Sequence, residues 1–245
     1  MASATIPAGL LDVLRQAGRV VFLTGSGVSA ESGVPTFRDA LTGLWARFRP
    51  EELATPEAFR QDPQLVWDWY RERRRQVAAV APNPAHHAIA ALEARLPDTL
   101  LVTQNVDGLH QRAGSIDAVE FHGNLFRNRC RGCGHESSHD DPELAAPPGC
   151  PGCGEPMGPG VVWFGETIPA PALERAWRAA GEADVIVAVG TSGLVTPAAA
   201  LPDVARRGGA LVVEVNLHTT PLSAAADFVV TGPAARTLPA IVAAL

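Results

Sequence analysis

The chain alternates between two patterns of hydrophobic and polar positions. Short apolar runs rich in Val, Ile and Leu are typical of buried strands, whereas longer stretches with apolar residues every three or four positions predict helices. The expected strands are 20–23, 100–102, 159–166, 184–189, 210–216 and 226–230. The expected helices are 6–18, 84–93, 170–181, 197–207 and one from about 238, with further helices between 40 and 80. This alternation predicts an α/β fold built on a doubly wound, Rossmann-like parallel sheet.

Several of these strands stop abruptly in small or polar residues, which predicts a ligand crevice at the carboxyl edge of the sheet. The first strand breaks into Thr24-Gly25-Ser26-Gly27, and a helix is expected from Ala30. Glycines directly after a strand let backbone N–H groups approach a pyrophosphate, whose charge the helix N-terminus favours. The GxGxxA pattern is nevertheless short, and an ordinary strand-to-helix turn is an alternative explanation.

The stretch 100–124 organises the rest of the chain. The apolar run 100–102 ends in Thr103, Gln104 and Asn105, and amides at a strand end usually hold something polar. His122 follows an apolar run and precedes Gly123, so its ring is expected at a neighbouring strand end, where backbone can approach closely. That position makes His122 a candidate base. A hydrogen-bonded structural histidine fits the same stretch equally well.

An arginine-rich helix, 67–75, carries the strongest positive cluster. Tyr70 and Arg73 are three residues apart and share a helix face, so a phenol and a guanidinium could together hold a carboxylate. On local grounds alone a solvated Arg-rich face is the simpler interpretation. In the helix that follows, His86 and His87 point in different directions and cannot share one metal, so one of them is expected to pack or cap.

The four cysteines form two CxxC pairs, Cys130/Cys133 and Cys150/Cys153. This arrangement predicts a tetrahedral four-thiolate zinc site with no open ligand position, and therefore a structural metal. His135 and His139 lie between the pairs and are expected on the surface.

Composition narrows the possible functions. The formal net charge of −6 disfavours nucleic-acid binding, and no apolar run is long enough for a membrane span. The N-terminus lacks the features of a signal peptide, so a cytoplasmic protein is expected, and it is expected to be a monomer. All 20 basic residues are Arg, so any lysine substrate must come from another chain.

Taken together, these segments resemble the sirtuins, the NAD-dependent protein deacylases, over nearly the whole chain. The resemblance rests on Gly25–Arg38, Thr103–Asp107, His122–Gly123, the paired CxxC motifs, Val162–Glu166, Gly190–Ser192 and Asn216. Ser26 replaces the Ala that is common in the first loop, a small-for-small change that should leave phosphate binding intact. The resemblance implies two parts: an NAD-binding domain of 1–38, 82–124 and 160–245, and a small helical and zinc-ribbon domain of 39–81 and 125–159.

The resemblance also implies roles for individual residues. His122 corresponds to the catalytic base, and Asn105 and Asp107 would orient nicotinamide and ribose. The implied cofactor-binding residues are Gly25, Ser26, Gly27, Ala30, Glu31, Thr36, Phe37, Arg38, Trp45, Gln104, Asn105, Asp107, His122, Gly190, Thr191, Ser192, Asn216 and Ala234. The implied substrate-binding residues are Tyr70, Arg73, Val161, Val162, Trp163, Phe164 and Gly165, the last five as a strand edge that pairs with an extended peptide.

The expected reaction is removal of acyl groups from protein lysines with NAD as co-substrate, giving nicotinamide and 2′-O-acyl-ADP-ribose. Tyr70 with Arg73, supported by Thr36, resembles the branch of bacterial CobB and the mitochondrial desuccinylase, which implies succinyl and malonyl groups besides acetyl. Arg71, Arg74 and Arg75 are still expected to form a solvated face. Two rival functions are transfer of ADP-ribose to a protein, and a non-enzymatic NAD-sensing or nucleic-acid-binding zinc ribbon.

Overall fold

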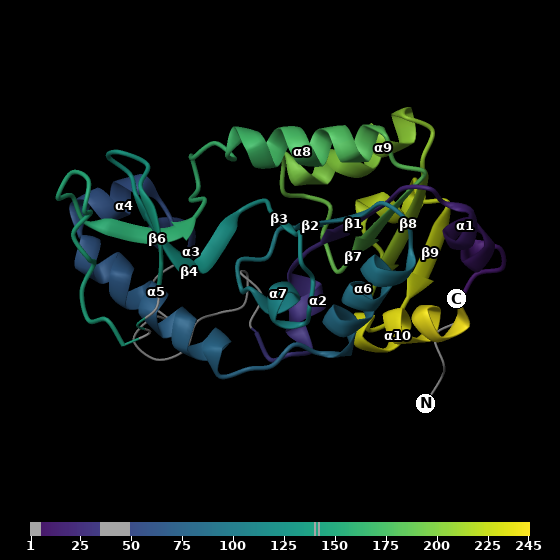
Figure 1. Cartoon of the computed structure of the whole chain (residues 1–245), viewed down its shortest axis with the longest axis horizontal. Helices are drawn as coiled ribbons and strands as arrows, with labels where there is room; N and C mark the ends of the chain where they lie inside the picture. Colours follow the sequence, from purple (N-terminus) through teal and green to yellow (C-terminus); the bar gives the residue numbers. More distant parts are fainter. Residues whose placement is uncertain (1–5, 35–49, 140, 142) are drawn as a thin grey trace.

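The computed structural model describes residues 6–34, 50–139, 141 and 143–245. In these ranges the larger part of the molecule is a six-stranded parallel sheet in the order β3-β2-β1-β7-β8-β9 (Figure 1). Its strands are β1 (Val20–Thr24), β2 (Thr99–Thr103), β3 (Val119–Glu120), β7 (Val185–Val189), β8 (Leu211–Asn216) and β9 (Phe228–Thr231). The fold class expected from the sequence is therefore confirmed.

Helices cover both faces of this sheet, because alternate strand residues point to opposite sides and both sides are apolar. Phe22 and Val187 pack on one side with α1 (Leu10–Gln16), α6 (Pro84–Arg95) and α10 (Ala234–Ala244). Val21 and Ile186 pack on the other side with α8 (Ala170–Gly181) and α9 (Leu201–Arg207). Figure 1 shows α8 and α9 on one side and α6 and α10 on the other.

The strand order places a switch point at the centre of the sheet. β1 pairs with β2 on one side and β7 on the other, so the chain winds outward in both directions from this boundary. The short helix α2 (Ser26–Ala30) begins directly after β1, and α7 (Leu109–Arg112) follows β2. In open parallel sheets, ligands bind at the carboxyl ends of the strands at such a boundary.

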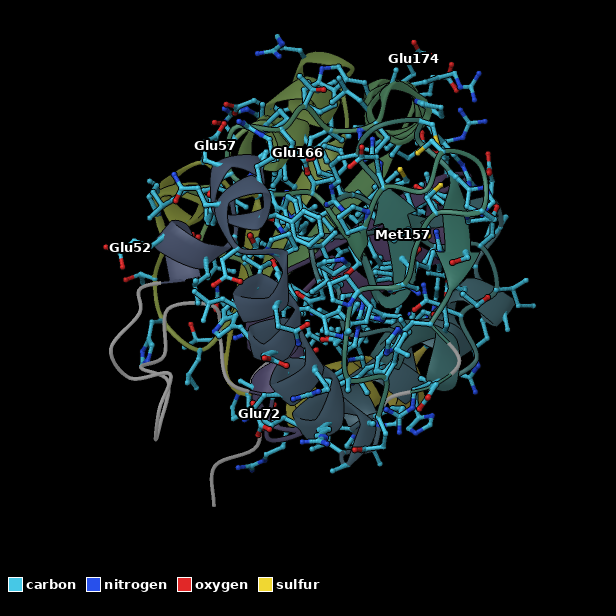
Figure 2. All side chains as sticks on the ribbon, turned by 90° about the vertical axis from the view of Figure 1, so that its left-hand side faces the viewer. Glu52, Glu57, Glu72, Met157, Glu166 and Glu174 are labelled. Carbon is cyan, nitrogen blue, oxygen red and sulfur yellow. The ribbon has the colours of Figure 1, made fainter. Side chains whose placement is uncertain are left out.

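A smaller part packs beside the sheet and joins helices to a three-stranded antiparallel sheet in the order β5-β4-β6. Its elements are α3 (Pro50–Leu53), α4 (Pro56–Gln61), α5 (Pro63–Ala78), β4 (Gly123–Cys130), β5 (Glu136–Ser138) and β6 (Met157–Val161). Thr55 and Asp62 cap α4 and α5 with side-chain oxygens, which fixes where both helices begin. Figure 2 views this end, with Glu57 on α4, Glu72 on α5 and Met157 on the small sheet.

Three expectations about element boundaries are wrong. The strand expected over 159–166 is β6, which ends at Val161; Phe164 then donates its N–H to the Ala54 carbonyl and Gly165 has a φ of 83°, so the chain turns. The last helix begins at Ala234 rather than near residue 238, directly after Pro233. The helix expected over 197–207 is split into a 3₁₀ turn, Ala198–Ala200, and α9.

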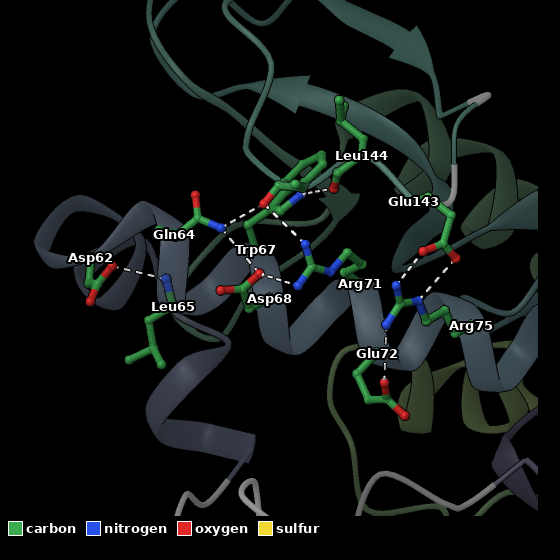
Figure 3. Close-up of polar contacts among 11 residues, drawn as sticks. Asp62, Gln64, Leu65, Trp67, Asp68, Arg71, Glu72, Arg75, Glu143 and Leu144 are labelled. Carbon is green, nitrogen blue, oxygen red and sulfur yellow. Dashed lines mark hydrogen bonds and ion pairs between the residues drawn. The ribbon is translucent and has the colours of Figure 1, made fainter.

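Two expectations of surface exposure are also wrong. Arg74 is fully buried: its guanidinium lies over the Trp67 ring at 4.6 Å, and Nε donates to the Leu125 carbonyl at 2.6 Å. His139 is buried too, with its ring edge-on to Trp67 at 5.5 Å. Both residues fill the contact between α5 and the small sheet. Arg71 and Arg75 point outward from α5, where they pair with Asp68 and Glu143 (Figure 3).

Within the described ranges no helix combines the length and the apolar character needed to cross a membrane. The domain boundaries given by the resemblance stay a prediction.

Candidate active site

The turns after β1 and β7 interlock through glycines. Gly27 donates its N–H to the Gly190 carbonyl at 2.9 Å. A Cβ on Gly27 would lie 2.8 Å from Gly190 Cα, and one on Gly25 would lie 2.8 Å from the Gly190 oxygen. No side chain fits between the two turns. Glycine is therefore required for this backbone contact, in addition to any room that it gives a ligand. This contact is a structural reason for both glycines, and their role in cofactor binding stays a prediction.

Polar side chains tie the neighbouring strand ends together at the same edge. Gln104, after β2, donates to Thr191 Oγ1 at 2.9 Å, and Asn216, at the end of β8, donates to the Thr191 carbonyl at 2.8 Å. Ser192 Oγ accepts from the Leu194 N–H at 3.4 Å. Side chains from three strand ends thus form one continuous polar rim.

His122 has one ring nitrogen fixed and the other available. Nδ1 lies 3.0 Å from the Gln104 carbonyl oxygen, and because a carbonyl only accepts, Nδ1 carries the proton. Nε2 therefore presents a lone pair and makes no hydrogen bond with the described part of the chain. Burial lowers the pKa of His122 below its ordinary value, partly offset by the bond to Gln104. The ring is consequently a neutral base at neutral pH.

The glycine after His122 is required by packing. Gly123 has a φ of 77°, and a Cβ there would lie only 2.1 Å from the Gly160 oxygen. It pairs with Val161 at the junction of β4 and β6. The close backbone approach expected from the sequence is thus present, and it fixes His122 against the small sheet.

A buried polar network lies beneath this rim. Asn105 Nδ2 donates to the Gly25 carbonyl at 3.1 Å and to Ser29 Oγ at 3.0 Å. Ser29 in turn donates to Asp107 Oδ2 at 2.7 Å, and the Leu109 N–H donates to Oδ1 at 2.9 Å. Burial raises the pKa of Asp107, while these hydrogen bonds counteract the rise. The network orients both side chains that the resemblance assigns to catalysis.

Sequence reasoning gave no role to Ser29 and did not predict its contact with a histidine. His86 Nδ1 accepts the Asn83 N–H at 3.2 Å and completes a capping box, so its Nε2 carries the proton and donates to Ser29 Oγ at 3.2 Å. Burial lowers the pKa of His86 to about 4. The expectation that one of the two adjacent histidines caps is confirmed. Only the Asn-Pro-x-His spacing hinted at this contact.

The segment after β6 connects the base to α5. The Val162 N–H donates to the His122 carbonyl at 2.8 Å, and Trp163 Nε1 donates to the Tyr70 hydroxyl oxygen at 3.0 Å. The N–H groups of Trp163 and Phe164 also bond within the chain. In the described part of the chain this leaves the Val162 carbonyl and the Gly165 N–H for pairing with a peptide. The Phe164 side chain is 48% exposed beside them.

Tyr70 and Arg73 lie on the same side of α5. Tyr70 is buried with its ring edge-on to Trp69 at 4.5 Å, and the Arg73 guanidinium lies over Trp69 at 5.0 Å. Burial raises the pKa of Tyr70 far above its ordinary value, although the nearby Arg73 charge opposes the rise. Burial likewise lowers the pKa of Arg73, which Tyr70 opposes. The two groups are therefore desolvated neighbours, unlike the outward-facing Arg71 and Arg75.

The remaining residues expected to bind the cofactor either lie at α2 and α10 or fall outside the described part of the chain. Glu31 Oε2 accepts the Ala235 N–H at 2.8 Å, which ties the end of α2 to the start of α10, where Ala234 is buried. Ser26 and Ala30 are the first and last residues of α2. The others lie outside the described residues: Thr36, Phe37, Arg38 and Trp45.

The four cysteines converge as expected. Their Sγ atoms all lie within 4.8 Å of one another, with Cys130–Cys153 at 3.4 Å and Cys133–Cys150 at 3.5 Å. A tetrahedron of sulfurs about 2.3 Å from zinc has sulfur–sulfur distances of roughly 3.8 Å, so the cluster fits the ion. All four positions are thiolates, which matches a structural site.

An imidazole base beside glycine-rich turns, at the switch point of a parallel sheet, is typical of dinucleotide-dependent enzymes. The fold and the site therefore assign this protein to that class. Comparison with known proteins narrows this class. The model of the Sir2 family matches residues 25–197, and the chain belongs to that family. The sirtuin resemblance noted in the sequence is thereby confirmed.

Individual relatives match this chain over nearly its full length. An NAD-dependent protein deacylase of Ralstonia nicotianae is 55% identical over 244 residues, covering 99% of this chain and 98% of the relative. The crystal structure of a Sir2 homolog–NAD complex superposes with a TM-score of 0.92 at 43% identity, covering 100% of this chain and 95% of that one. A Sir2 complex with a deacetylated p53 peptide and 3′-O-acetyl ADP ribose has a TM-score of 0.82 at 31% identity, with 96% of each chain covered. The enzyme class expected from the sequence agrees with these names.

Proposed function

We propose that this protein is an NAD-dependent protein deacylase that removes acyl groups from lysine side chains of other proteins. The observation that carries the proposal is the His122 ring at the strand ends that meet at the switch point, with Nδ1 held by the Gln104 carbonyl and Nε2 without a hydrogen bond to the residues that the structure describes. The similarity to a Sir2–NAD complex and to a protein deacylase supports it. The expected products are nicotinamide, free lysine and 2′-O-acyl-ADP-ribose.

The residues at the sheet edge fit NAD. The interlocked turns at Gly25 and Gly190 exclude side chains from the backbone at the strand ends, and Thr191 and Asn216 line the rim beside them. NAD, when bound, supplies an electrophilic ribose carbon by release of nicotinamide. Asn105 and Asp107, held by Ser29, would orient the bound group. His122 would accept a proton from a ribose hydroxyl at Nε2, and the bond to Gln104 would keep the ring aimed during that transfer.

The partner proposed is a protein or peptide that carries an acylated lysine. The chain contains no lysine, so the substrate side chain comes from elsewhere. A related Sir2 protein has been crystallised with a deacetylated peptide, which supports a peptide site in this family. Here the Val162 carbonyl and the Gly165 N–H are the backbone groups through which an extended peptide would pair.

The proposed acyl preference is for succinyl and malonyl over acetyl groups. Tyr70 and Arg73 support it, because they are desolvated neighbours on one side of α5 and offer a hydroxyl and a guanidinium to a carboxylate. A hydrogen bond to a charged group contributes about 1.5–3 kcal/mol, which corresponds to roughly 10- to 150-fold in selectivity.

The test compares kcat/KM on matched succinyl and acetyl peptides. Arg73→Met should lower the succinyl-to-acetyl ratio by at least about tenfold. Arg71→Met is the matched control, because Arg71 lies on the same helix but pairs with Asp68 on the outer face. A ratio that is unchanged in Arg73→Met would rule out the acyl preference. Labelled NAD that instead modifies an acceptor protein would favour the rival ADP-ribosyltransferase.

A further inference from the structure

Arg131 lies between two cysteines of the first CxxC pair, yet its side chain turns away from the sulfur cluster. Its guanidinium lies flat against the Trp163 ring, with Cζ 3.6 Å from the ring centroid. Its N–H groups meet four acceptors, namely Glu166 Oε1 at 3.3 Å and the carbonyls of Pro159 at 2.6 Å, Val161 at 2.8 Å and Arg129 at 3.2 Å. One side chain thus fixes both the end of β6 and the indole that follows it.

Glu166 completes this clamp. Its Oε1 accepts from Arg131 while its Oε2 accepts the Trp163 backbone N–H at 2.8 Å. The Arg131 guanidinium and the Glu166 carboxylate form a mostly buried ion pair. Arg131 holds the ring face of Trp163 and Glu166 holds its backbone. Together these contacts fix the direction of the indole N–H.

That indole N–H sets the orientation of the Tyr70 hydroxyl. An indole nitrogen only donates, so in the 3.0 Å bond the Tyr70 oxygen is the acceptor. The hydroxyl hydrogen is then left to donate elsewhere, and no acceptor for it lies among the residues that the structure describes. Trp163 therefore leaves Tyr70 as a hydrogen-bond donor, which is the role that a carboxylate ligand requires.

The residue at position 158 makes room for this arrangement. A Cβ on Gly158 would lie 3.0 Å from Arg131 Nη1 and 3.0 Å from Trp163 Cη2. Any larger side chain on β6 would have to displace the guanidinium or the ring. The missing side chain at position 158 therefore leaves the space that the Arg131 guanidinium, from the turn after β4, and the Trp163 ring occupy.

From this geometry we propose that Arg131 is a positioning residue for acyl selectivity. It acts through Trp163 to hold the Tyr70 hydroxyl as a donor toward the acyl chain. The proposal rests on the function proposed above, because it assumes that Tyr70 contacts the acyl group. It predicts that selectivity among acyl groups depends on a side chain that itself belongs to the zinc-binding part of the chain.

The test exploits the fact that Tyr70 is the only tyrosine in the sequence. Protein labelled with 3-fluorotyrosine gives a single ¹⁹F resonance that reports on this ring alone. Arg131→Met should shift the resonance by more than its linewidth without moving it to the position of the unfolded protein. In unlabelled protein the same variant should lower the succinyl-to-acetyl ratio of kcat/KM at least fivefold, mainly through a higher KM for the succinyl peptide.

Arg129→Met is the matched control, since Arg129 lies on β4 two residues before Arg131, and its side chain pairs with Glu136 at 4.0 Å instead of contacting Trp163. It should leave both the resonance and the ratio within error of the wild type. Gly158→Ala is a second variant that disturbs the stack without removing a charge, and it should change both readouts in the same direction as Arg131→Met. If Arg131→Met does not fold, Gly158→Ala tests the proposal by itself.

Two outcomes would overturn the proposal. One is a folded Arg131→Met or Gly158→Ala protein whose ¹⁹F resonance stays in place. The other is a resonance that moves while the ratio between peptides stays within twofold of the wild type. A wild type without succinyl preference would instead refute the proposed acyl preference, and the fluorine shift would still decide whether Arg131 positions Tyr70.

Discussion

At the scale of single residues, the protonation of His122 determines how activity depends on pH. Its pKa lies below 6.5 because burial disfavours the charged ring, and the neutral ring is the form that can accept a proton. We therefore expect kcat/KM to fall as pH drops through a value below 6.5 and to stay level from there up to neutral pH. A pH profile between 5 and 8 measures this limb. An acid limb centred above pH 7 would contradict the assignment.

Replacement of His122 provides a direct check of the same role. His122→Ala should lower kcat by about 10²–10⁴-fold, which is typical for loss of a general base. His87→Ala is the control, because His87 is an exposed histidine on α6. Binding of NAD, measured by calorimetry, should persist in both variants. Activity that survives in His122→Ala would show that another group accepts the proton.

The burial of Tyr70 makes a second residue-scale prediction. Desolvation raises its pKa well above the ordinary value near 10, and it is the only phenol in the chain. The tyrosinate absorbance of the folded protein should therefore be absent up to about pH 11. The same protein in denaturant should ionise near pH 10, which provides the internal control. Ionisation of the folded protein near pH 10 would mean that the phenol is solvated.

At the scale of elements, the sequence predicted the buried strands well because they are short uninterrupted apolar runs. It failed where tertiary contacts end an element. Val162 and Trp163 continue the apolar run of β6, but their N–H groups bond to His122 and Glu166 instead of to a neighbouring strand. Arg74 could not be predicted as buried, because its partners on β4 are about fifty residues away and invisible to helical periodicity.

The contact of α6 and α7 with β1 predicts an acid-labile fold. His86 and His110 are buried with ring centroids 4.8 Å apart, and burial lowers their pKa values to about 4 and about 3. The unfolded chain protonates both near pH 6.5, so it binds more protons than the folded chain below that pH. Stability from these neutral rings is present above pH 6.5 and decreases as pH falls toward 4.

The expected loss at pH 5 is about 2 kcal/mol for each ring, at roughly 1.4 kcal/mol per pH unit. Urea unfolding at pH 7 and pH 5 measures it. His110→Gln should reduce the difference between the two pH values by about 2 kcal/mol, whereas His87→Gln, at an exposed position, is the control and should leave it unchanged. An unchanged pH dependence in His110→Gln would show that this ring does not resist protonation.

The two CxxC turns predict one tightly held zinc ion per chain. The four Sγ atoms already lie within 4.8 Å of one another, so their charges repel unless a cation binds between them. Elemental analysis should give one zinc per chain, and a strong chelator should lower the thermal midpoint. Cys150→Ser should lose the metal. Retention of the ion by that variant would mean that the thiolates are not all ligands.

At the scale of the whole molecule, the sequence predicted which polar side chains meet, because parallel strands bring their carboxyl ends to one edge. Gln104, Thr191 and Asn216 were predictable in this way, since each lies at the end of its strand or within two residues of it. The His86–Ser29 contact was not, because it joins α6 to α2 across 57 positions of the chain, and no local pattern encodes such a pairing. The contacts of the residues beyond the described ranges stay predictions.

The two halves of the sheet meet at the interlocked turns after β1 and β7, so a single methyl group there should affect the whole fold. Alanine within a helix normally stabilises it relative to glycine by up to about 1 kcal/mol. Gly181→Ala, in α8, should follow that rule, because its Cβ would meet only Val204 at 3.9 Å. Gly27→Ala should do the opposite, because its Cβ would press on the Gly190 backbone at 2.8 Å, and the turns must separate at a cost of about 1–3 kcal/mol.

The same separation should weaken NAD binding, since the cofactor is proposed to bind at these turns. Urea unfolding and calorimetric titration of both variants measure the two effects side by side. A Gly27→Ala protein as stable as Gly181→Ala would mean that the turns can relax without cost. The contact between them would then not determine how the halves of the sheet are joined. Reduced stability with unchanged NAD affinity would place the cofactor away from this boundary.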